Sequence, residues 1–324
     1  MINKNKTVEY VNAVCKSNEQ KLLGAERLRR MAESSSLEEC FAILRENTFF
    51  GGEGEYLASD FARLLQNEEL RLINFIKEYA PNRECELFCL SHYDFYNAEV
   101  LVKCEFNKIP CDKFIGAEGI YSVEQLKNQL LQGKGDFSKE LVGAVNDSRK
   151  ALSEGFGGMS VGTIFKKAYF KALLKNVKTA YIKEIIKDRI DALNVLSCLR
   201  SENFDMAKGF FIEGGNLSKQ CYKAISERNE SAVKALIPPH LREITLRAMA
   251  VADRGEALIE FERNADSLGA QRMIDNRYFE LDGTNPFILY YYRRKNEIQC
   301  ARTVLTGKQN SLDAELIKLR MITV

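Results

Sequence analysis

The chain has 324 residues, and its 47 Lys and Arg residues against 45 Asp and Glu residues give a formal net charge of +2. This length predicts about two domains with enough residues to bury a large core. Nucleic acids and anionic membrane surfaces bind proteins through an excess of basic residues, so the even charge balance argues against either as the main partner. With 45 % hydrophobic residues, the composition is that of an ordinary globular protein.

Residues that break helices are scarce in this chain. It contains 20 Gly, 5 Pro and no Trp, and its long stretches mix charged with apolar residues. This composition predicts an all-α fold. The first residues lack the apolar core of a secretory signal, and the uncharged runs at 155–165 and 283–292 are shorter than the roughly 18 residues of a membrane helix. We therefore expect a cytoplasmic protein without a membrane span.

Apolar residues recur at helical spacing along most of the chain. The predicted helices span residues 7–31, 36–48, 56–79, 94–107, 122–132, 137–154, 163–175, 178–200, 218–237, 241–252, 255–270, 286–306 and 311–321. We expect Gly307 to stop the helix before it and Ser311 to cap the last helix. The last helix then carries Leu312, Leu316 and Leu319.

Two kinds of segment recur along the chain. The first is a capped helix start, Ser36–Glu39 and Ser122–Gln125, in which a Ser is followed three residues later by Glu or Gln. A looser third copy has Asn216 as the expected cap. The three starts lie about 90 residues apart, which is the kind of regular spacing that indicates an internal repeat.

The second recurring segment contains Asp-x-x-Asn followed by two apolar residues and a basic residue. It occurs at Asp94 with Asn97 and again at Asp191 with Asn194, and a degenerate third copy has Glu297 in place of the aspartate. Three residues apart on a helix, the two side chains of each pair can bond a helix end, which predicts a structural role. The alternative is that their oxygen atoms bind a hard cation.

The two series interleave and predict three related helical units of about 100 residues. We place them at 1–115, which includes the N-terminal helix, at 116–211 and at 212–324. Solenoid repeats usually span about 20–50 residues, so each unit here is large enough to form a small helical bundle.

Nine cysteines are scattered along the chain without a Cys-x-x-Cys motif. Their odd number and apolar neighbours predict buried thiols in a reducing compartment. Cys85 and Cys89 are close enough in sequence to share a helix face and bind a metal. The only histidines, His92 and His240, lack the spacing of zinc ligands, so core cysteines are the preferred interpretation and the two histidines are expected at a helix start and a turn.

The remaining motifs indicate no catalytic, cofactor or metal site. The glycine-rich segments 51–54 and 155–162 match no phosphate-binding loop and are interpreted as loops between helices. The aromatic and basic run at 290–294 has the composition of a surface that stacks on nucleobases. A helix with tyrosines on its apolar side and arginines in water is the simpler interpretation.

The segment Asn285–Asn310 resembles the closing signature of the C subunit of archaeal and bacterial V/A-type ATPases, which is similar to the d subunit of eukaryotic vacuolar ATPases. The resembling positions are Pro286, Glu297, Ile298, Arg302, Gly307, Lys308, Glu315 and Ile317. Ser311 departs from the glycine expected in that turn. Residues 10–23 and 26–50 and the two Asp-x-x-Asn segments also resemble parts of the family.

The resemblance implies a funnel-shaped, all-α subunit with three related subdomains around a pseudo-threefold axis. It implies a non-catalytic rotor subunit of the central stalk, present in one copy on the cytoplasmic face of the membrane. Such a subunit links the central shaft, made of D-type and F-type subunits, to the proteolipid ring and transmits torque for ion transport, such as proton transport, or ATP synthesis. The alternatives are a helical interaction scaffold of another cytoplasmic assembly and an unrecognised helical enzyme.

Overall fold

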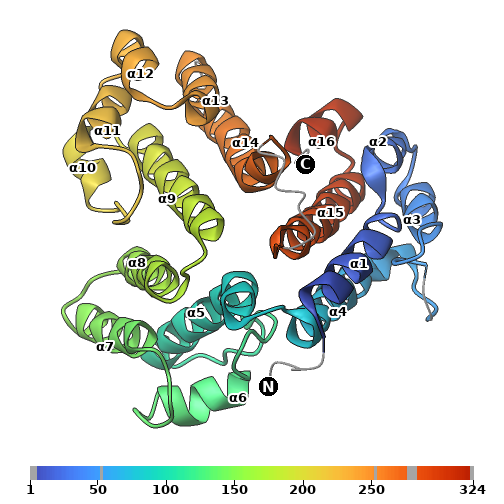
Figure 1. Ribbon diagram of the computed structural model, residues 1–324, viewed down its shortest axis with the longest axis horizontal. Helices are drawn as coiled ribbons and strands as arrows, with labels where there is room; N and C mark the ends of the chain where they lie inside the picture. Colours follow the sequence, from blue (N-terminus) through green and yellow to red (C-terminus); the bar gives the residue numbers. More distant parts are fainter. Residues whose placement is uncertain (1–5, 52–53, 252–253, 276–282, 322–324) are drawn as a thin grey trace. The chain divides into compact units, whose positions relative to one another are not determined.

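The computed structural model describes residues 6–51, 54–251, 254–275 and 283–321. Within these ranges every regular element is a helix (Figure 1), which confirms the predicted all-α fold. None of the helices in the described ranges is long and apolar enough to cross a membrane.

The chain forms two compact units. The first unit combines residues 1–81 with 243–324, and the second contains residues 82–242. The boundary between them falls inside α13 (Pro239–Ala250). The division into three repeats stays a prediction.

The first unit is built around the long helix α15, which packs against both early and late helices of the chain. Its elements are α1 (Val8–Glu19), α2 (Gly24–Glu33), α3 (Leu37–Arg45), the 3-10 turn η1 (Ala58–Asp60), α4 (Phe61–Tyr79), α14 (Arg254–Asp275), α15 (Asn285–Gln309) and α16 (Ala314–Arg320). Buried residues occur on all sides of α15, as expected for a helix surrounded by others. Residues from the two halves of the sequence therefore share one core.

The second unit contains a bundle in which α5, α7 and α8 pack on one another. Its elements are α5 (Arg83–Asn107), α6 (Val123–Gln125), the π-helical turn η2 (Leu126–Leu130), α7 (Lys139–Ser153), α8 (Gly158–Asn176), α9 (Ala180–Arg200), α10 (Phe204–Lys208), α11 (Lys219–Ser226) and α12 (Glu230–Leu236). Phe95, Leu101, Leu141 and Phe165 lie in the shared core of the bundle. Helix α9 packs in turn against α8, α10 and α11.

Two of the predicted helices are interrupted. The predicted helix 7–31 is wrong as a single element, because α1 ends at Glu19 and α2 begins only at Gly24, where φ is +72°. The backbone N–H of Leu23 donates to Glu297 of α15, so this break is fixed by a contact with a distant helix. The predicted helix 218–237 is likewise broken at Arg228, which has φ 52°, before Asn229 caps α12.

Gly307 does not stop α15 as predicted, because the helix continues past it. A Cβ atom at Gly307 would lie 2.6 Å from Cγ1 of Ile317 on α16, so the glycine allows close helix packing. The left-handed turn falls instead at Ser311, with φ 54°. Asp313, and not the predicted Ser311, caps α16 by accepting the backbone N–H of Glu315.

The last helix buries Ile317 and leaves two of its leucines in water. Leu316 is 49 % exposed and Leu319 is exposed as well, whereas Ile317 is buried. The side of α16 that packs is the one on which Ile317 meets Gly307. Sequence spacing found the helix but not its buried side.

Two of the three predicted helix caps are present. The hydroxyl of Ser36 accepts the N–H of Glu39, and Ser122 forms a complete capping box with Gln125. The predicted cap at Asn216 is wrong, because α11 begins later, after Ser218. The N–H of Asn216 donates to Asp191 instead.

Other local predictions have mixed outcomes. The nine cysteines are all buried, as predicted. The predicted loop 155–162 is mostly wrong, because α8 already begins at Gly158. His92 lies inside α5 and not at its start, and His240 lies in the first turn of α13.

Candidate functional site

The first Asp–Asn pair holds a loop against α5. The backbone N–H groups of Ile120 and Tyr121 donate to the carboxylate of Asp94 at 3.2 and 3.0 Å. The side-chain amide of Asn97 accepts one backbone N–H and donates to one carbonyl in the same loop, residues 116–121, at 2.8 and 2.9 Å. Both side chains are fully buried. We call this arrangement the α5 clamp.

The second pair repeats this arrangement on α9. The N–H groups of Asn216 and Leu217 donate to the carboxylate of Asp191 at 2.8 and 3.1 Å. Asn194 accepts the N–H of Ile212 at 2.8 Å and donates to the carbonyl of the same residue at 2.9 Å. In this α9 clamp, as in the α5 clamp, a helix holds the loop that leads into the next helix, α11 here and α6 there.

The clamps also explain two glycines in the loops they hold. A Cβ atom at Gly119 would lie 2.6 Å from Oδ1 of Asp94, and one at Gly215 would lie 2.1 Å from Oδ1 of Asp191. Only a residue without a side chain allows the backbone to come this close to the carboxylate. The Asp, the Asn and the loop glycine therefore act together.

The α9 clamp includes a tyrosine hydroxyl. The hydroxyl of Tyr222 donates to Asp191 at 2.6 Å and accepts from the amide of Asn194 at 3.2 Å. Burial raises the pKa of Asp191, although the hydrogen bonds from Tyr222 and the backbone oppose this shift. At the corresponding place in the α5 clamp, five residues after Tyr121, the chain has Leu126.

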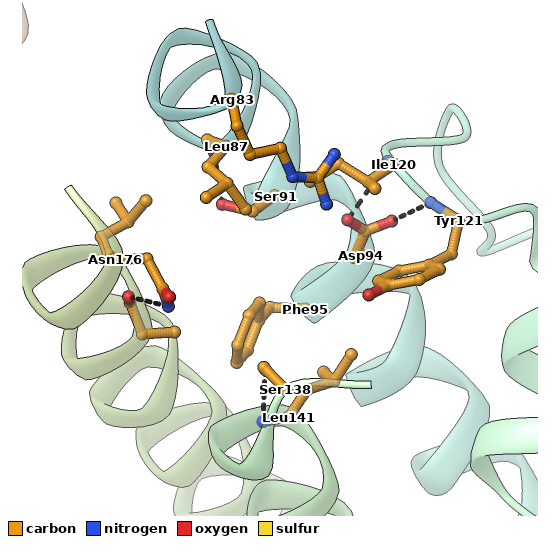
Figure 2. A pocket seen from close by; sticks show the side chains of 12 residues that line it. Arg83, Leu87, Ser91, Asp94, Phe95, Ile120, Tyr121, Ser138, Leu141 and Asn176 are labelled. Carbon is orange, nitrogen blue, oxygen red and sulfur yellow. Dashed lines mark hydrogen bonds between the residues drawn. The ribbon is translucent and has the colours of Figure 1, made fainter. Parts of the chain in front are cut away.

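A pocket lies beside Asp94 in the second unit (Figure 2). It measures about 410 Å³, including space open to solvent, and is lined by α5, the loop at residues 120–121, the start of α7 and the end of α8. Ser91, Ser138 and Asn176 line it, and each already bonds the backbone of its own helix. Burial, followed by the nearby Asp94 charge, raises the pKa of Tyr121.

The chemistry of this pocket is limited. Its lining contains no His or Cys, and its one carboxylate, Asp94, is bonded to two backbone N–H groups. Arg83 at the pocket is paired with Glu86 at 2.5 Å. Across the described ranges no group of three or more His, Cys, Asp or Glu side chains is placed to hold a metal ion. The oxygen atoms of the Asp–Asn pairs bind the backbone, which disfavours the cation alternative.

Glu297, the predicted counterpart of the two aspartates, also bonds a distant backbone N–H. It accepts from the N–H of Leu23 in the turn between α1 and α2. It also accepts from Arg294, one turn earlier on α15, and Arg294 donates in addition to Glu68 on α4. We call Glu68, Arg294 and Glu297 the buried ion cluster. At its edge, Glu68 also pairs at 2.6 Å with Arg71, whose side chain is more than half exposed.

The three side chains of the buried ion cluster are shielded from water. Arg294 is 3 % exposed, and its guanidinium lies 4.2 and 4.7 Å from the ring centres of Phe49 and Phe50. Burial raises the pKa of both Glu68 and Glu297, and the positive charge of Arg294 opposes that shift in each. The guanidinium therefore compensates two buried carboxylates at once.

The sequence missed Arg294 and Glu68. The prediction that the arginines of run 290–294 face water is wrong for Arg294, whereas Tyr290 and Tyr291 are buried as predicted. The only local signal for Arg294 is its position three residues before Glu297, which places both on one helix face. Nothing near Glu68 in the sequence indicates its partner 226 residues away.

The other predicted positions do not join this cluster. Arg302 is partly exposed and forms an ion pair with Glu69 at 3.6 Å. Glu315 is exposed and pairs with Lys318 at 2.9 Å. Together with Gly307, which contacts α16, these positions have separate structural roles along α15 and α16 and form no common site.

The comparisons with known proteins agree with this architecture. The family model described as ATP synthase (C/AC39) subunit matches residues 11–320. The chain belongs to this family. This assignment confirms the resemblance noted in the C-terminal segment of the sequence.

Similar curated proteins span almost the same length. The C subunit of the V-type sodium ATPase of Enterococcus hirae is 20 % identical, covering 97 % of this chain and 98 % of the relative. The C subunit of the A-type ATP synthase of Thermococcus kodakarensis is 21 % identical, covering 95 % of this chain and 88 % of the relative. The C subunit of the A-type ATP synthase of Haloferax volcanii is 20 % identical, covering 97 % of each chain.

Proposed function

We propose that this chain is a non-catalytic rotor subunit in the central stalk of a V/A-type rotary ATPase. It links the central shaft, of D-type and F-type subunits, to the membrane proteolipid ring and transmits torque between them. The observation that carries the proposal is the family match over residues 11–320, supported by relatives of similar length that are named as C subunits. A funnel of three related subdomains around a pseudo-threefold axis belongs to the same proposal.

The internal structure suits a part that carries torque. The long helices α5 and α9 hold their loops through buried, charge-assisted hydrogen bonds, and α15 holds helices from the other end of the sequence through the buried ion cluster. Packed helical cores have low compressibility and transmit strain. A stiff socket loses little of the applied torque to internal deformation.

The features of the pocket favour an adaptor over an enzyme. Catalysis usually needs a nucleophile, an acid–base pair or a metal within reach of a substrate. The polar side chains around Asp94 are bonded to the backbone of their own unit, so they stabilise the fold. Nucleotide chemistry would then belong to other subunits of the proposed assembly.

The proposed partners define the location. A single copy would lie on the cytoplasmic face of the membrane and reach it through protein contacts with the ring. We expect an interface with the shaft of roughly 1,200–2,000 Å², the usual size for a specific contact between proteins.

The test is affinity purification of the tagged chain from native membranes solubilised with a mild detergent, followed by mass spectrometry with quantified ratios. The proposal expects the shaft, the proteolipid and about three copies each of the large nucleotide-binding subunits for every copy of this chain. Recovery of the chain alone, or with soluble partners only, would contradict the rotor role. That outcome would favour a helical scaffold of another assembly.

A further inference from the structure

A titratable pair joins the start of α13 to α9 inside the second unit. Nε2 of His240, in the first turn of α13, lies 3.4 Å from Oδ1 of Asp188 on α9. The side chain of Asp188 is 4 % exposed, whereas that of His240 is 35 % exposed. A buried carboxylate therefore faces an imidazole that can exchange protons with water.

The backbone around His240 is anchored. Pro239 is the first residue of α13, and its ring presets the backbone angle φ that a helix start requires. Ile237 and Leu241, which lie before and after this turn, are fully buried. The imidazole therefore reaches Asp188 from a fixed helix start.

Two further carboxylates flank Asp188 on α9. Positions 184, 188 and 191 share one helix face because they are spaced by four and three residues. Glu184 pairs with Lys187 at 2.8 Å. Asp191 belongs to the α9 clamp, where the hydroxyl of Tyr222 on α11 donates to it. The face of α9 that meets His240 is therefore acidic.

The other charged side chains around the start of α13 have partners of their own. They are Arg242, which donates to the carbonyl of Ile237, and the exposed pairs Glu230–Lys234 and Glu243–Arg247. The partial positive charge at the start of a helix repels a charged imidazole in its first turn. The charged form of His240 is therefore stabilised by the α9 carboxylates, with Asp188 in direct contact.

The corresponding place beside the α5 clamp contains uncharged side chains. Ser91 stands three residues before the clamp aspartate of α5, as Asp188 does on α9. Ser138 caps α7, the long helix that follows, and both serines line the pocket in Figure 2. The chain thus builds one such junction without ionisable groups. What His240 adds at the other junction is a dependence on protonation.

We propose that His240 and Asp188 form a pH-sensitive latch that holds the first turn of α13 on α9. Histidine is the side chain that ordinarily gains or loses its proton between pH 5 and 8. With the proton, the imidazole is attracted to the buried carboxylate, and without it this attraction is lost. The chain crosses from the second unit to the first within α13, so the latch sets how firmly the second unit holds one of the two crossings. This inference goes beyond the proposed function and does not depend on it.

The first test compares melting temperatures of the purified, untagged chain at pH 6 and pH 8. The chain has only two histidines, so His92→Gln gives a background in which His240 is the only imidazole. Adding His240→Gln to this background is expected to lower the melting temperature by about 2–4 °C at pH 6 and by less than about 1 °C at pH 8. A histidine with a purely structural role would give the same loss at both pH values.

Hydrogen exchange followed by mass spectrometry locates the effect. After correction for the intrinsic exchange rate at each pH, His240→Gln is expected to reduce protection of residues 241–245 about threefold at pH 6 and not at pH 8. Residues 141–145 are the internal control, because the start of α7 is capped by the uncharged Ser138. Their protection is expected to be the same with and without His240→Gln.

Two further variants separate charge from shape. His240→Lys keeps a positive charge at both pH values, so its difference in melting temperature from His240→Gln should be equal at pH 6 and pH 8. Asp188→Asn keeps the size of the side chain and removes its charge. Adding His240→Gln to Asp188→Asn should therefore lower the melting temperature at neither pH. Circular dichroism checks that each variant is folded.

Equal losses from His240→Gln at pH 6 and pH 8 would overturn the latch. A loss confined to pH 6 that persists in Asp188→Asn would also overturn it, because the carboxylate would not be the partner. The first comparison is decisive by itself if Asp188→Asn does not fold. None of these results bears on the rotor role, since no partner subunit enters the experiments.

Discussion

Removing the charge of Arg294 tests whether the buried ion cluster holds the first unit together. Arg294→Met keeps a side chain of similar length but leaves Glu68 and Glu297 buried without their shared cation. Breaking a buried pair costs about 3–5 kcal/mol, because an uncompensated charge remains inside the protein. The substitution also removes the cationic contact with the two phenylalanine rings, so we expect a loss at the upper end of that range.

The assay is urea unfolding followed by circular dichroism at pH 8, with Arg302→Met as the matched control. Arg302 is on the same helix, but its ion pair with Glu69 is partly exposed and 3.6 Å long. Such a pair contributes about 0–1 kcal/mol. A loss below about 1 kcal/mol for Arg294→Met, equal to the control, would refute the reasoning.

The pH dependence gives an independent check of the same cluster. Burial already raises the pKa of Glu68 and Glu297, and Arg294 opposes that shift, so its removal raises both values further. A carboxyl group with a raised pKa binds protons more readily in the folded state than in the unfolded state. The free energy of unfolding then falls as pH rises through the folded pKa. The deficit of Arg294→Met should therefore be largest at pH 8 and shrink as the pH falls toward 5.

Two further substitutions test the packing and the α9 clamp. Gly307→Ala places a Cβ atom 2.6 Å from Ile317, and we expect it to lower the free energy of unfolding by about 1–3 kcal/mol in thermal or urea unfolding. The control Gly143→Ala on α7 meets no atom within 4 Å and should raise that free energy by about 0.5–1 kcal/mol. Equal effects of the two substitutions would contradict the packing role of Gly307. Tyr222→Phe removes a hydroxyl that donates to the buried Asp191, and we expect it to lower the free energy of unfolding by about 1–3 kcal/mol. The loss should be largest above the raised pKa of Asp191, where the carboxylate is charged and the hydrogen bond is strongest. A loss that is constant from pH 5 to 8 would argue against the clamp.

The clamps show how a short motif positions a loop. In both, the carboxylate accepts two successive backbone N–H groups and the amide three residues later bonds the same loop. The Asp-x-x-Asn spacing puts the two side chains on one helix face, so the sequence was sufficient to predict that they act together. Which loop they hold was decided by the tertiary structure, because the bonded atoms lie 18 to 27 positions further along the chain.

The amino-acid sequence by itself determined the features that depend on neighbours within about four residues. Helical periodicity, the capping box at Ser122 and the pairing of Asp94 with Asn97 all follow from local geometry. The C-terminal segment also identified the family, because its signature is a run of neighbouring residues. Local rules were sufficient for these features because their physical causes lie within one or two helical turns.

Only the tertiary structure decided which sides of the helices are buried and which charges are paired. Arg294 is paired with a residue 226 positions away, and the break before Gly24 is fixed by Glu297, 274 positions from Leu23. Gly307 serves helix packing and Leu316 faces outward because of where α16 lies on α15. Burial and buried ion pairing depend on partners that local periodicity does not specify, which is why the sequence found these helices, placed Arg294 in water and did not indicate which side of α16 is buried.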